Sequence, residues 1–235
     1  MPAKKTKRSL VPKLRFPEFE GENKWSYSPL RDNAAIIKKK AGEEKYPVMS
    51  VESGVGLISQ LEKFGRDISG KSYKNYTVIR QGDFAYNKSA TKVFPEGYIA
   101  KYNDKENAAV PNSIFTCFRL SKGTINGDYL YYQLLDNLHG RWLRKFITVG
   151  ARANGALSIN NEDLLNLPVP LPAGPQSIEE QQKIADCLKS LDKLIAAHTA
   201  KLEALQDHKK GLLQQLFPAE GKTVPELRFP DYTDD

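Results

Sequence analysis

The clearest pattern of apolar and polar positions in this chain runs from Ser177 to Phe217. Starting at Ile184 and stepping alternately by four and three residues, eight of ten positions are apolar. These seam positions are Ile184, Leu188, Leu191, Ile195, His198, Leu202, Leu205, Lys209, Leu212 and Leu216. The spacing is the heptad pattern of a helix that packs along its length on another helix.

The sequence also indicates where this helix begins. Ser177 stands three residues before Glu180, which is the spacing of a capping box. A helix starting there is roughly 58 Å long at about 1.5 Å per residue, more than one small domain can bury. We therefore predict a long helix over residues 176–217 that requires a partner helix. The alternative is an ordinary amphipathic helix lying on its own domain.

Two polar residues interrupt the apolar seam. His198 and Lys209 occupy positions at which an apolar side chain would pack better. A polar seam residue costs stability but helps to set the register and orientation of the partner helix. The alternative is that both side chains extend out of the seam into solvent.

Shorter patterns precede the helix. Alternating, β-rich runs predict strands at 46–51, 76–80, 84–87, 97–102 and 113–120. A helical pattern follows, capped by Asp128, and residues 167–172 form an extended edge segment because their prolines cannot donate to a sheet. The expected fold class is α+β, with a mixed globular domain over residues 14–172 followed by the long helix.

A nine-residue motif occurs twice in the chain. Residues 11–19 read V-P-K-L-R-F-P-E-F and residues 224–232 read V-P-E-L-R-F-P-D-Y, with six identities and two conservative differences. The offset of 213 residues is the length of a domain. We therefore interpret residues 218–235 as a tail in which a second repeat begins.

The net charge of +7 is distributed unevenly. Residues 1–10 carry +4, the helical stretch 177–217 is neutral, the tail carries −3, and residues 11–176 carry +6. A basic globular part on a neutral helix is the layout expected of a nucleic-acid reader. Residues 1–13 are predicted to be a disordered basic arm.

The candidate DNA-binding residues form three basic clusters. Arg, Lys and Asn on loops read base edges, and Lys, Ser and Thr bind phosphates. The clusters are Lys71, Tyr73, Lys74 and Asn75, then Asn87, Lys88, Ser89, Thr91 and Lys92, and finally Arg141, Arg144, Lys145, Arg152 and Asn154. For any one of them, a solvated surface role is the alternative.

The chain resembles the specificity (S) subunit of type I restriction–modification systems. The resemblance rests on L-R-F-P-E-F at 14–19, G-D-F at 82–84 and N-S-I-F at 112–115. It also rests on L-P-V-P-L-P followed by E-E-Q-Q-K-I-A within 167–185, and on the helix ending H-K-K-G-L-L-Q-Q-L-F-P at 208–218.

This resemblance implies a non-catalytic, half-length subunit with one target-recognition domain. In the family, two such domains each read half of a bipartite site in double-stranded DNA. Paired helices separate the two domains and dock methyltransferase (M) subunits, through which the restriction (R) subunit joins the complex. The resemblance thus implies a homodimer through the long helix, or pairing with another S fragment, in the cytoplasm.

Signals of catalysis are weak. The sequence has no catalytic tetrapeptide of a DNA adenine methyltransferase, no Gly-rich cofactor loop and no cluster of metal ligands, so no cofactor or metal is expected. No apolar run is long enough to predict a membrane helix. The competing hypotheses are a coiled-coil scaffold whose basic domain binds protein, and a stand-alone nuclease.

Overall fold

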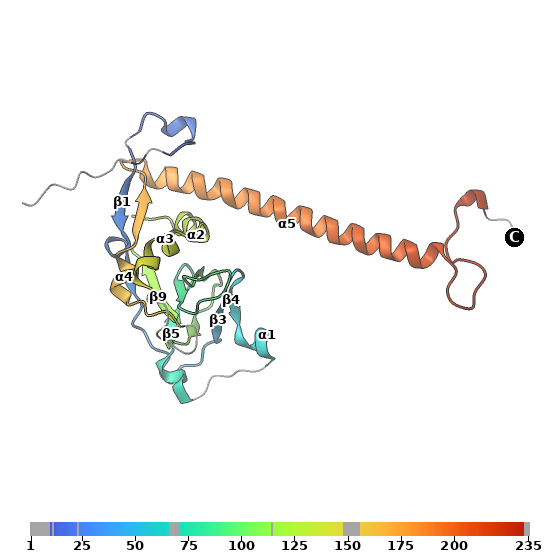
Figure 1. Ribbon diagram of the computed structural model, residues 1–235, viewed down its shortest axis with the longest axis horizontal. Coiled ribbons are helices and arrows are strands. Elements are labelled where there is room, and N and C mark those ends of the chain that lie inside the picture. The colour runs from blue at the N-terminus through green and yellow to red at the C-terminus, as the bar shows by residue number, and fades with distance from the viewer. Residues whose placement is uncertain are drawn as a thin grey trace, which may run out of the picture. The chain divides into compact units, whose positions relative to one another are not determined.

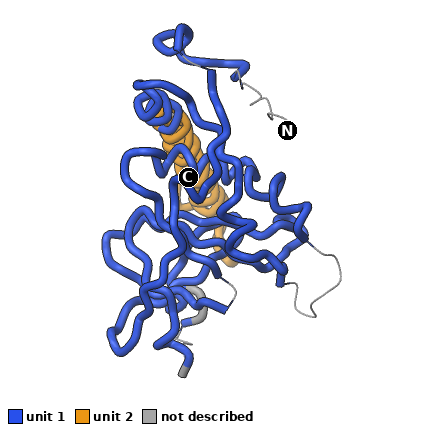
Figure 2. Tube along the Cα trace, turned by 90° about the vertical axis from the view of Figure 1, so that its left-hand side faces the viewer, with its two compact units in different colours: residues 1–185 blue, residues 186–235 orange. Residues whose placement is uncertain are grey.

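The computed structural model describes most of the chain. The described residues are 10, 12–22, 24–65, 71–113, 115–147 and 156–232. The chain divides into two compact units, residues 1–185 and residues 186–235 (Figure 2).

The first unit is built around a four-stranded antiparallel sheet (Figure 1). Its strands, in spatial order, are β2 (Ala34–Ile36), β9 (Phe115–Leu120), β6 (Phe84–Asn87) and β7 (Tyr98–Lys101). Strand β6 is buried on both faces: Phe84 and Tyr86 belong to one core cluster and Ala85 to another. This is the two-residue alternation of a strand that has a hydrophobic layer on each side.

Helices cover the face to which Phe84 and Tyr86 point. They are α2 (Gly127–Leu135), α3 (Leu138–Leu143) and α4 (Asn161–Leu165), and they contribute Leu130, Leu143 and Leu164 to that core. The cap of α2 is Asn126, whose Oδ1 accepts from the backbone N–H groups of Asp128 and Tyr129 at 2.9 and 3.0 Å. The prediction that Asp128 caps this helix is therefore wrong, because the side chain two residues earlier reaches both donors.

Two antiparallel strand pairs cover the opposite face. One pair is β3 (Met49–Glu52) with β4 (Gly56–Ser59), and the other is β5 (Thr77–Ile79) with β8 (Ala108–Val110). The helix α1 (Gln60–Phe64) follows β4. The sequence patterns missed β4, β8 and α1, which are three to five residues long and therefore too short to show a period.

The last strand pair brings the beginning and end of this unit together. Strand β1 (Ser26–Pro29) pairs antiparallel with β10 (Pro168–Leu171), the predicted extended edge segment. Leu10 forms a bridge with Trp25. The predicted disordered arm over 1–13 is therefore too long, because Leu10 is hydrogen-bonded to the folded unit; residues 1–9 lie outside the described residues.

The long helix α5 runs from Ser177 to Leu216, which is 40 residues, or about 60 Å. Its beginning lies in the first unit, where Ala185 is fully buried, and its remainder lies in the second unit. In the second unit the chain turns back after α5, and the Leu227 N–H donates to the Gln215 carbonyl at 3.0 Å. The predicted α+β class with one long helix is confirmed.

Candidate nucleic-acid interface

A buried ion pair anchors the beginning of α5. Arg15 donates from Nε and Nη2 to the two carboxylate oxygens of Glu180, at 2.8 and 2.7 Å. Trp25 Nε1 donates to the same carboxylate at 3.2 Å. The side chain of Glu180 is only 2% exposed and that of Arg15 13%. The hydrogen bonds that Arg15 donates to Glu180 raise the pKa of Arg15 above its usual value.

Two glutamines hold the same helix end against α2. Gln181 is fully buried, and its Oε1 accepts from the Asn126 N–H at 2.9 Å. Asn126 Nδ2 donates to Gln182 Oε1 at 2.6 Å. Within the E-E-Q-Q stretch of the sequence, Glu180, Gln181 and Gln182 therefore anchor the first turns of α5 to the domain.

The capping box predicted at this helix end does not form. The Ser177 hydroxyl donates to the Pro172 carbonyl at 2.7 Å, and the Glu180 carboxylate is taken by Arg15 and Trp25. A capping box needs the glutamate to reach back to the backbone at the helix start. Charged and indole donors from a segment 155–165 residues away occupy it instead.

The first copy of the repeated motif makes a second contact with α5. Glu18 pairs with Lys183 at 3.1 Å, and Lys183 Nζ lies 5.6 Å from the centre of the Phe16 ring. Phe19 is buried. We refer to Trp25, Glu180 and Lys183 as the anchor seat, since these side chains receive the motif.

The first predicted DNA-binding cluster is partly structural. The Tyr73 hydroxyl accepts from the Tyr46 N–H at 2.6 Å and donates to the Glu44 carbonyl at 2.9 Å. Lys74 pairs with Glu43 at 2.5 Å, and Asn75 is exposed. Nothing is described of the Lys71 side chain. Through its hydroxyl, Tyr73 therefore holds the 43–46 segment in place.

The structure adds lysines that the candidate set omitted. Lys39 Nζ lies 5.7 Å from the centre of the Tyr46 ring and 3.3 Å from its hydroxyl, and Lys40 donates to Thr77 at 3.3 Å. The basic run at 38–40 thereby joins the first cluster. We define the lysine surface as the exposed residues Lys38, Lys39, Lys40, Lys45, Lys74 and Asn75. The run of three lysines was the signal available in the sequence.

The second predicted cluster lies at the loop 88–97, which joins β6 to β7. Asn87 is buried, and its Oδ1 accepts from the Ser89 N–H at 2.9 Å, so it shapes the loop. Thr91 Oγ1 accepts from the Phe94 N–H at 2.9 Å, which closes the loop tip. Lys92 is exposed, and Lys88 and Ser89 are half-buried.

A glycine makes the base of this loop possible. Gly97 has φ of +82°, and a Cβ there would lie 2.3 Å from the Asn87 carbonyl oxygen. Only glycine fits both the left-handed backbone and this close approach. The loop therefore starts and ends on adjacent, tightly packed strand ends.

The third predicted cluster is joined to the second by one buried acid. Arg144 pairs with Glu96, at 2.7 Å from Nε, and the Glu96 side chain is only 5% exposed. Burial by itself raises the pKa of Glu96, but hydrogen bonds from Arg144 and Asn137 and the Arg144 charge lower it below the usual value overall. Arg144 thus positions the 88–97 loop.

Two further residues of the third cluster, Arg141 and Lys145, are exposed. Arg141 pairs with Asp136 at 2.8 Å, and Lys145 Nζ lies 3.0 Å from the centre of the Trp142 ring. Arg152 and Asn154 lie outside the described residues. We define the loop surface as Lys88, Ser89, Thr91, Lys92, Arg141, Arg144 and Lys145. The structure brings these two predicted clusters together through the Glu96–Arg144 pair.

The seam of α5 is largely exposed beyond its anchored end. Ile184 packs against the domain core, whereas Leu191 is 49% exposed, Ile195 63% and Leu202 56%. Leu188 and Leu205 are also exposed, as are His198 and Lys209, while Leu212 and Leu216 are half-buried.

Among the described residues, no group of three or more His, Cys, Asp or Glu side chains could hold a metal ion. Within the same ranges, none of the helices combines the length and apolar character that crossing a bilayer requires.

Comparison with curated proteins returns relatives of one kind. The chain is 29% identical over 203 residues to a Methanocaldococcus jannaschii protein assigned as the MjaX specificity subunit of a type I restriction enzyme. That match covers 82% of this chain and 45% of the relative. The MjaVIII specificity subunit of the same organism is 29% identical over 89 residues, covering 38% of this chain and 19% of that protein. The chain thus spans less than half the length of these relatives.

Comparison with solved structures supports the fold. The HsdS subunit from Thermoanaerobacter tengcongensis matches with a TM-score of 0.54 at 17% identity, over 88% of this chain and 54% of that one. The type I restriction–modification S subunit from M. genitalium matches with a TM-score of 0.53 at 16% identity, over 88% and 49%. At these identities the likeness shows the fold alone.

The decisive comparison is with a family model described as the type I restriction modification DNA specificity domain, which matches residues 28–207. That span contains both basic surfaces, the β10 junction and most of α5. The resemblance drawn from the sequence motifs is thereby confirmed, and the chain belongs to the family of type I restriction–modification specificity subunits.

Proposed function

We propose that this chain is a sequence-specific DNA-recognition subunit that reads one half of a bipartite site. Residues 14–172 form the target-recognition domain, and residues 176–217 form the helix for dimerisation and methyltransferase docking. The tail, residues 218–235, begins a second repeat. Catalysis then belongs to the M and R subunits that join the complex.

The observation that carries the proposal is the loop surface. A loop with exposed or half-buried Lys88, Thr91 and Lys92 is held at its base by Gly97 and at its end by the Glu96–Arg144 pair. Rigid placement of cationic and hydroxyl side chains suits a groove, because base readout depends on fixed geometry. The lysine surface supplies further contacts to phosphates.

Pairing through α5 would supply the second half-site. The exposed Leu and Ile residues of the seam leave apolar surface in water, at about 25 cal/mol per Å². Such a face is most commonly buried against a second, identical chain related by a two-fold axis. An antiparallel pair presents two recognition domains in inverted orientation, so a homodimer should prefer a symmetric, interrupted site.

Charge reversal in the loop surface tests DNA binding. We expect Lys88→Glu with Lys92→Glu to weaken duplex binding and to make the slope of log K against log salt shallower by up to about 1.8, since each phosphate that a lysine neutralises adds about 0.9 to the slope. Lys105→Glu with Lys122→Glu, at two exposed lysines outside both surfaces, is the control with the same change in net charge. If both variants lose the same affinity for duplex DNA, the loss is explained by net charge alone, and this loop is not part of the DNA interface.

Selection from random duplex DNA tests the half-site hypothesis separately. We expect the full chain to enrich two inverted half-sites with a fixed gap. A single continuous, non-palindromic motif would contradict it. Binding that ignores both salt and sequence would favour the scaffold alternative.

A further inference from the structure

The two copies of the repeated motif adopt the same local structure. Residues Pro17–Phe19 and Pro230–Tyr232 each form one turn of 3₁₀ helix. The Phe19 N–H donates to the Phe16 carbonyl at 2.9 Å, and the Tyr232 N–H donates to the Phe229 carbonyl at 2.9 Å. The second copy of the motif therefore already has the 3₁₀ turn with which the first copy binds the anchor seat.

The surroundings of the two copies differ. The Arg15 side chain is 13% exposed, and Phe19 is 6% exposed. The corresponding residues of the second copy are Arg228, which is exposed, and Tyr232, which is 71% exposed.

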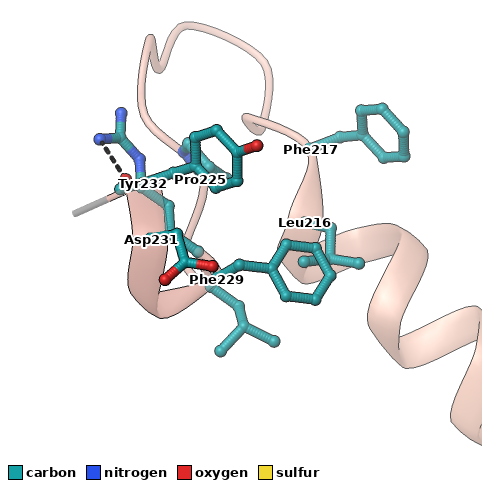
Figure 3. Close-up of a pocket in the computed structure, with 8 residues that line it drawn as sticks. Leu216, Phe217, Pro225, Phe229, Asp231 and Tyr232 are labelled. Atoms are coloured by element: carbon teal, nitrogen blue, oxygen red, sulfur yellow. Dashed lines mark hydrogen bonds between the residues drawn. The ribbon is translucent and has the colours of Figure 1, made fainter. Parts of the chain in front are cut away.

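The second copy of the motif and the end of α5 together line a hollow. Leu216, Phe217 and Pro225 line it together with Phe229 and Tyr232 (Figure 3). The Arg228 Nη1 group donates to the Tyr232 carbonyl at 3.3 Å (Figure 3). The motif is thus preformed but largely unburied, which leaves its aromatic side chains available for an interface.

The second copy also keeps the charges that the anchor seat recognises. Arg228 stands in the place of Arg15, which binds Glu180, and Asp231 stands in the place of Glu18, which binds Lys183. Glu180 and Lys183 lie three residues apart on one face of α5, so the seat presents an acid and a base in a fixed order. The motif at 224–232 presents a base and an acid in the matching order.

We propose that residues 224–232 dock on the anchor seat of a partner chain, an identical second molecule of this protein. There they take the place of the partner chain's own residues 12–19. The inference rests on the proposed pairing through α5. An antiparallel pair that overlaps the whole seam from Ile184 to Leu216 sets position 180 of one helix beside about position 220 of the other. The motif begins four residues further on, within reach of the seat.

The exchange replaces residues 12–19 on the anchor seat by residues 224–232, which have nearly the same sequence. The Arg–Glu and acid–Lys ion pairs break within one chain and form again across the pair, so the free-energy difference between the two states is small, as in domain swapping. Pairing of two chains through α5 brings residues 224–232 of one chain close to the anchor seat of the other and so raises their effective concentration there. The anchor seat then joins the two copies at both ends of the helix pair.

Cross-linking between two tagged chains tests the inference. Both chains carry Cys187→Ser, which removes the exposed thiol, while buried Cys117 remains. One chain also carries Lys183→Cys and the other Asp231→Cys, both at exposed positions. We expect a short bismaleimide reagent to link the mixed chains and to link neither chain with itself.

Two further substitutions separate docking from mere proximity. Arg228→Ala in the Asp231→Cys chain should lower the yield at least several-fold, whereas Lys222→Ala, an exposed tail cation outside the motif, should not. Arg15→Ala in the Lys183→Cys chain should raise the yield, because it weakens the competing segment.

Light scattering on the same mixtures distinguishes the outcomes. A dimer without cross-linking, or cross-linking that Arg228→Ala and Lys222→Ala change equally, overturns the docking and leaves the pairing intact. A monomer at all concentrations overturns both. Cross-linking that responds as expected supports both.

Discussion

The Arg15–Glu180 pair offers a test with a control built into the sequence. Arg15 and Arg228 lie in the same L-R-F-P context and precede the same 3₁₀ turn. Among the described residues, Arg15 donates two hydrogen bonds to the buried carboxylate of Glu180, at 2.7 and 2.8 Å, whereas Arg228 is exposed. Truncating each arginine to alanine therefore changes the same local sequence in two different surroundings.

The expected magnitude follows from burial. Removing one partner of a buried ion pair typically costs about 3–5 kcal/mol, because the other charge stays hidden without compensation. In Arg15→Ala, Glu180 keeps the hydrogen bond from Trp25. Because Arg15 itself is 13% exposed and truncation admits water, we expect the lower end, about 3 kcal/mol. For Arg228→Ala we expect a change within about 0.5 kcal/mol, as for surface substitutions in general.

Urea unfolding of the first unit, followed by tryptophan fluorescence, measures the difference. The protein is kept at concentrations at which light scattering gives a monomer, because there Arg228 of another chain cannot take the place of Arg15. With a slope of about 2 kcal/mol per molar urea, Arg15→Ala should lower the midpoint by about 1.5 M. Adding Glu180→Gln removes the orphaned charge, so the double variant should recover at least about 1 kcal/mol relative to Arg15→Ala. This recovery distinguishes the removal of a charge partner from a defect in packing.

The predicted cost is wrong if Arg15→Ala destabilises the protein by less than about 1 kcal/mol or by no more than Arg228→Ala does. It is also wrong if Glu180→Gln deepens the destabilisation in the double variant. Either result would mean that the carboxylate is well solvated without its partner.

Three other outcomes are expected. Leu202→Ala removes a seam side chain that is 56% exposed in the single chain and whose burial on pairing is worth about 1 kcal/mol per chain. The dimer dissociation constant, measured by light scattering in a dilution series, should therefore rise about 30-fold. An unchanged constant would show that Leu202 does not lie on the pairing face. Because the pKa of Glu96 is lowered in the folded state, its contribution to stability is present above the unfolded value and is lost as the pH falls through the lower folded value. Glu96→Gln should therefore flatten the decline of stability in urea unfolding as the pH falls below about 4.3, the ordinary pKa of glutamate; an unchanged decline would contradict a stabilising Arg144–Glu96 pair. A thiol reagent should modify exposed Cys187 at once and Cys117 only on unfolding, since burial raises the pKa of Cys117 to about 12; two fast thiols would contradict the burial.

Several features of this protein follow from sequence alone because their physical cause is local. The heptad spacing of α5 depends only on the 3.6-residue period of a helix, and the structure has this helix within one residue of the predicted bounds. The alternation in β6 and the prolines of β10 likewise act within a few residues. The family was recognisable because its motifs are short and contiguous.

Other features were decided by contacts between distant segments. Glu180 has capping-box spacing, yet its carboxylate binds Arg15, 165 residues away, because two guanidinium hydrogen bonds outweigh one backbone hydrogen bond. Arg144 has the composition of a DNA contact, yet it pairs with Glu96, which no local pattern connects to it. Sequence periodicity reports which face of an element is apolar, whereas the partner of a buried charge depends on the chain that folds against it, and only the tertiary structure supplies that partner.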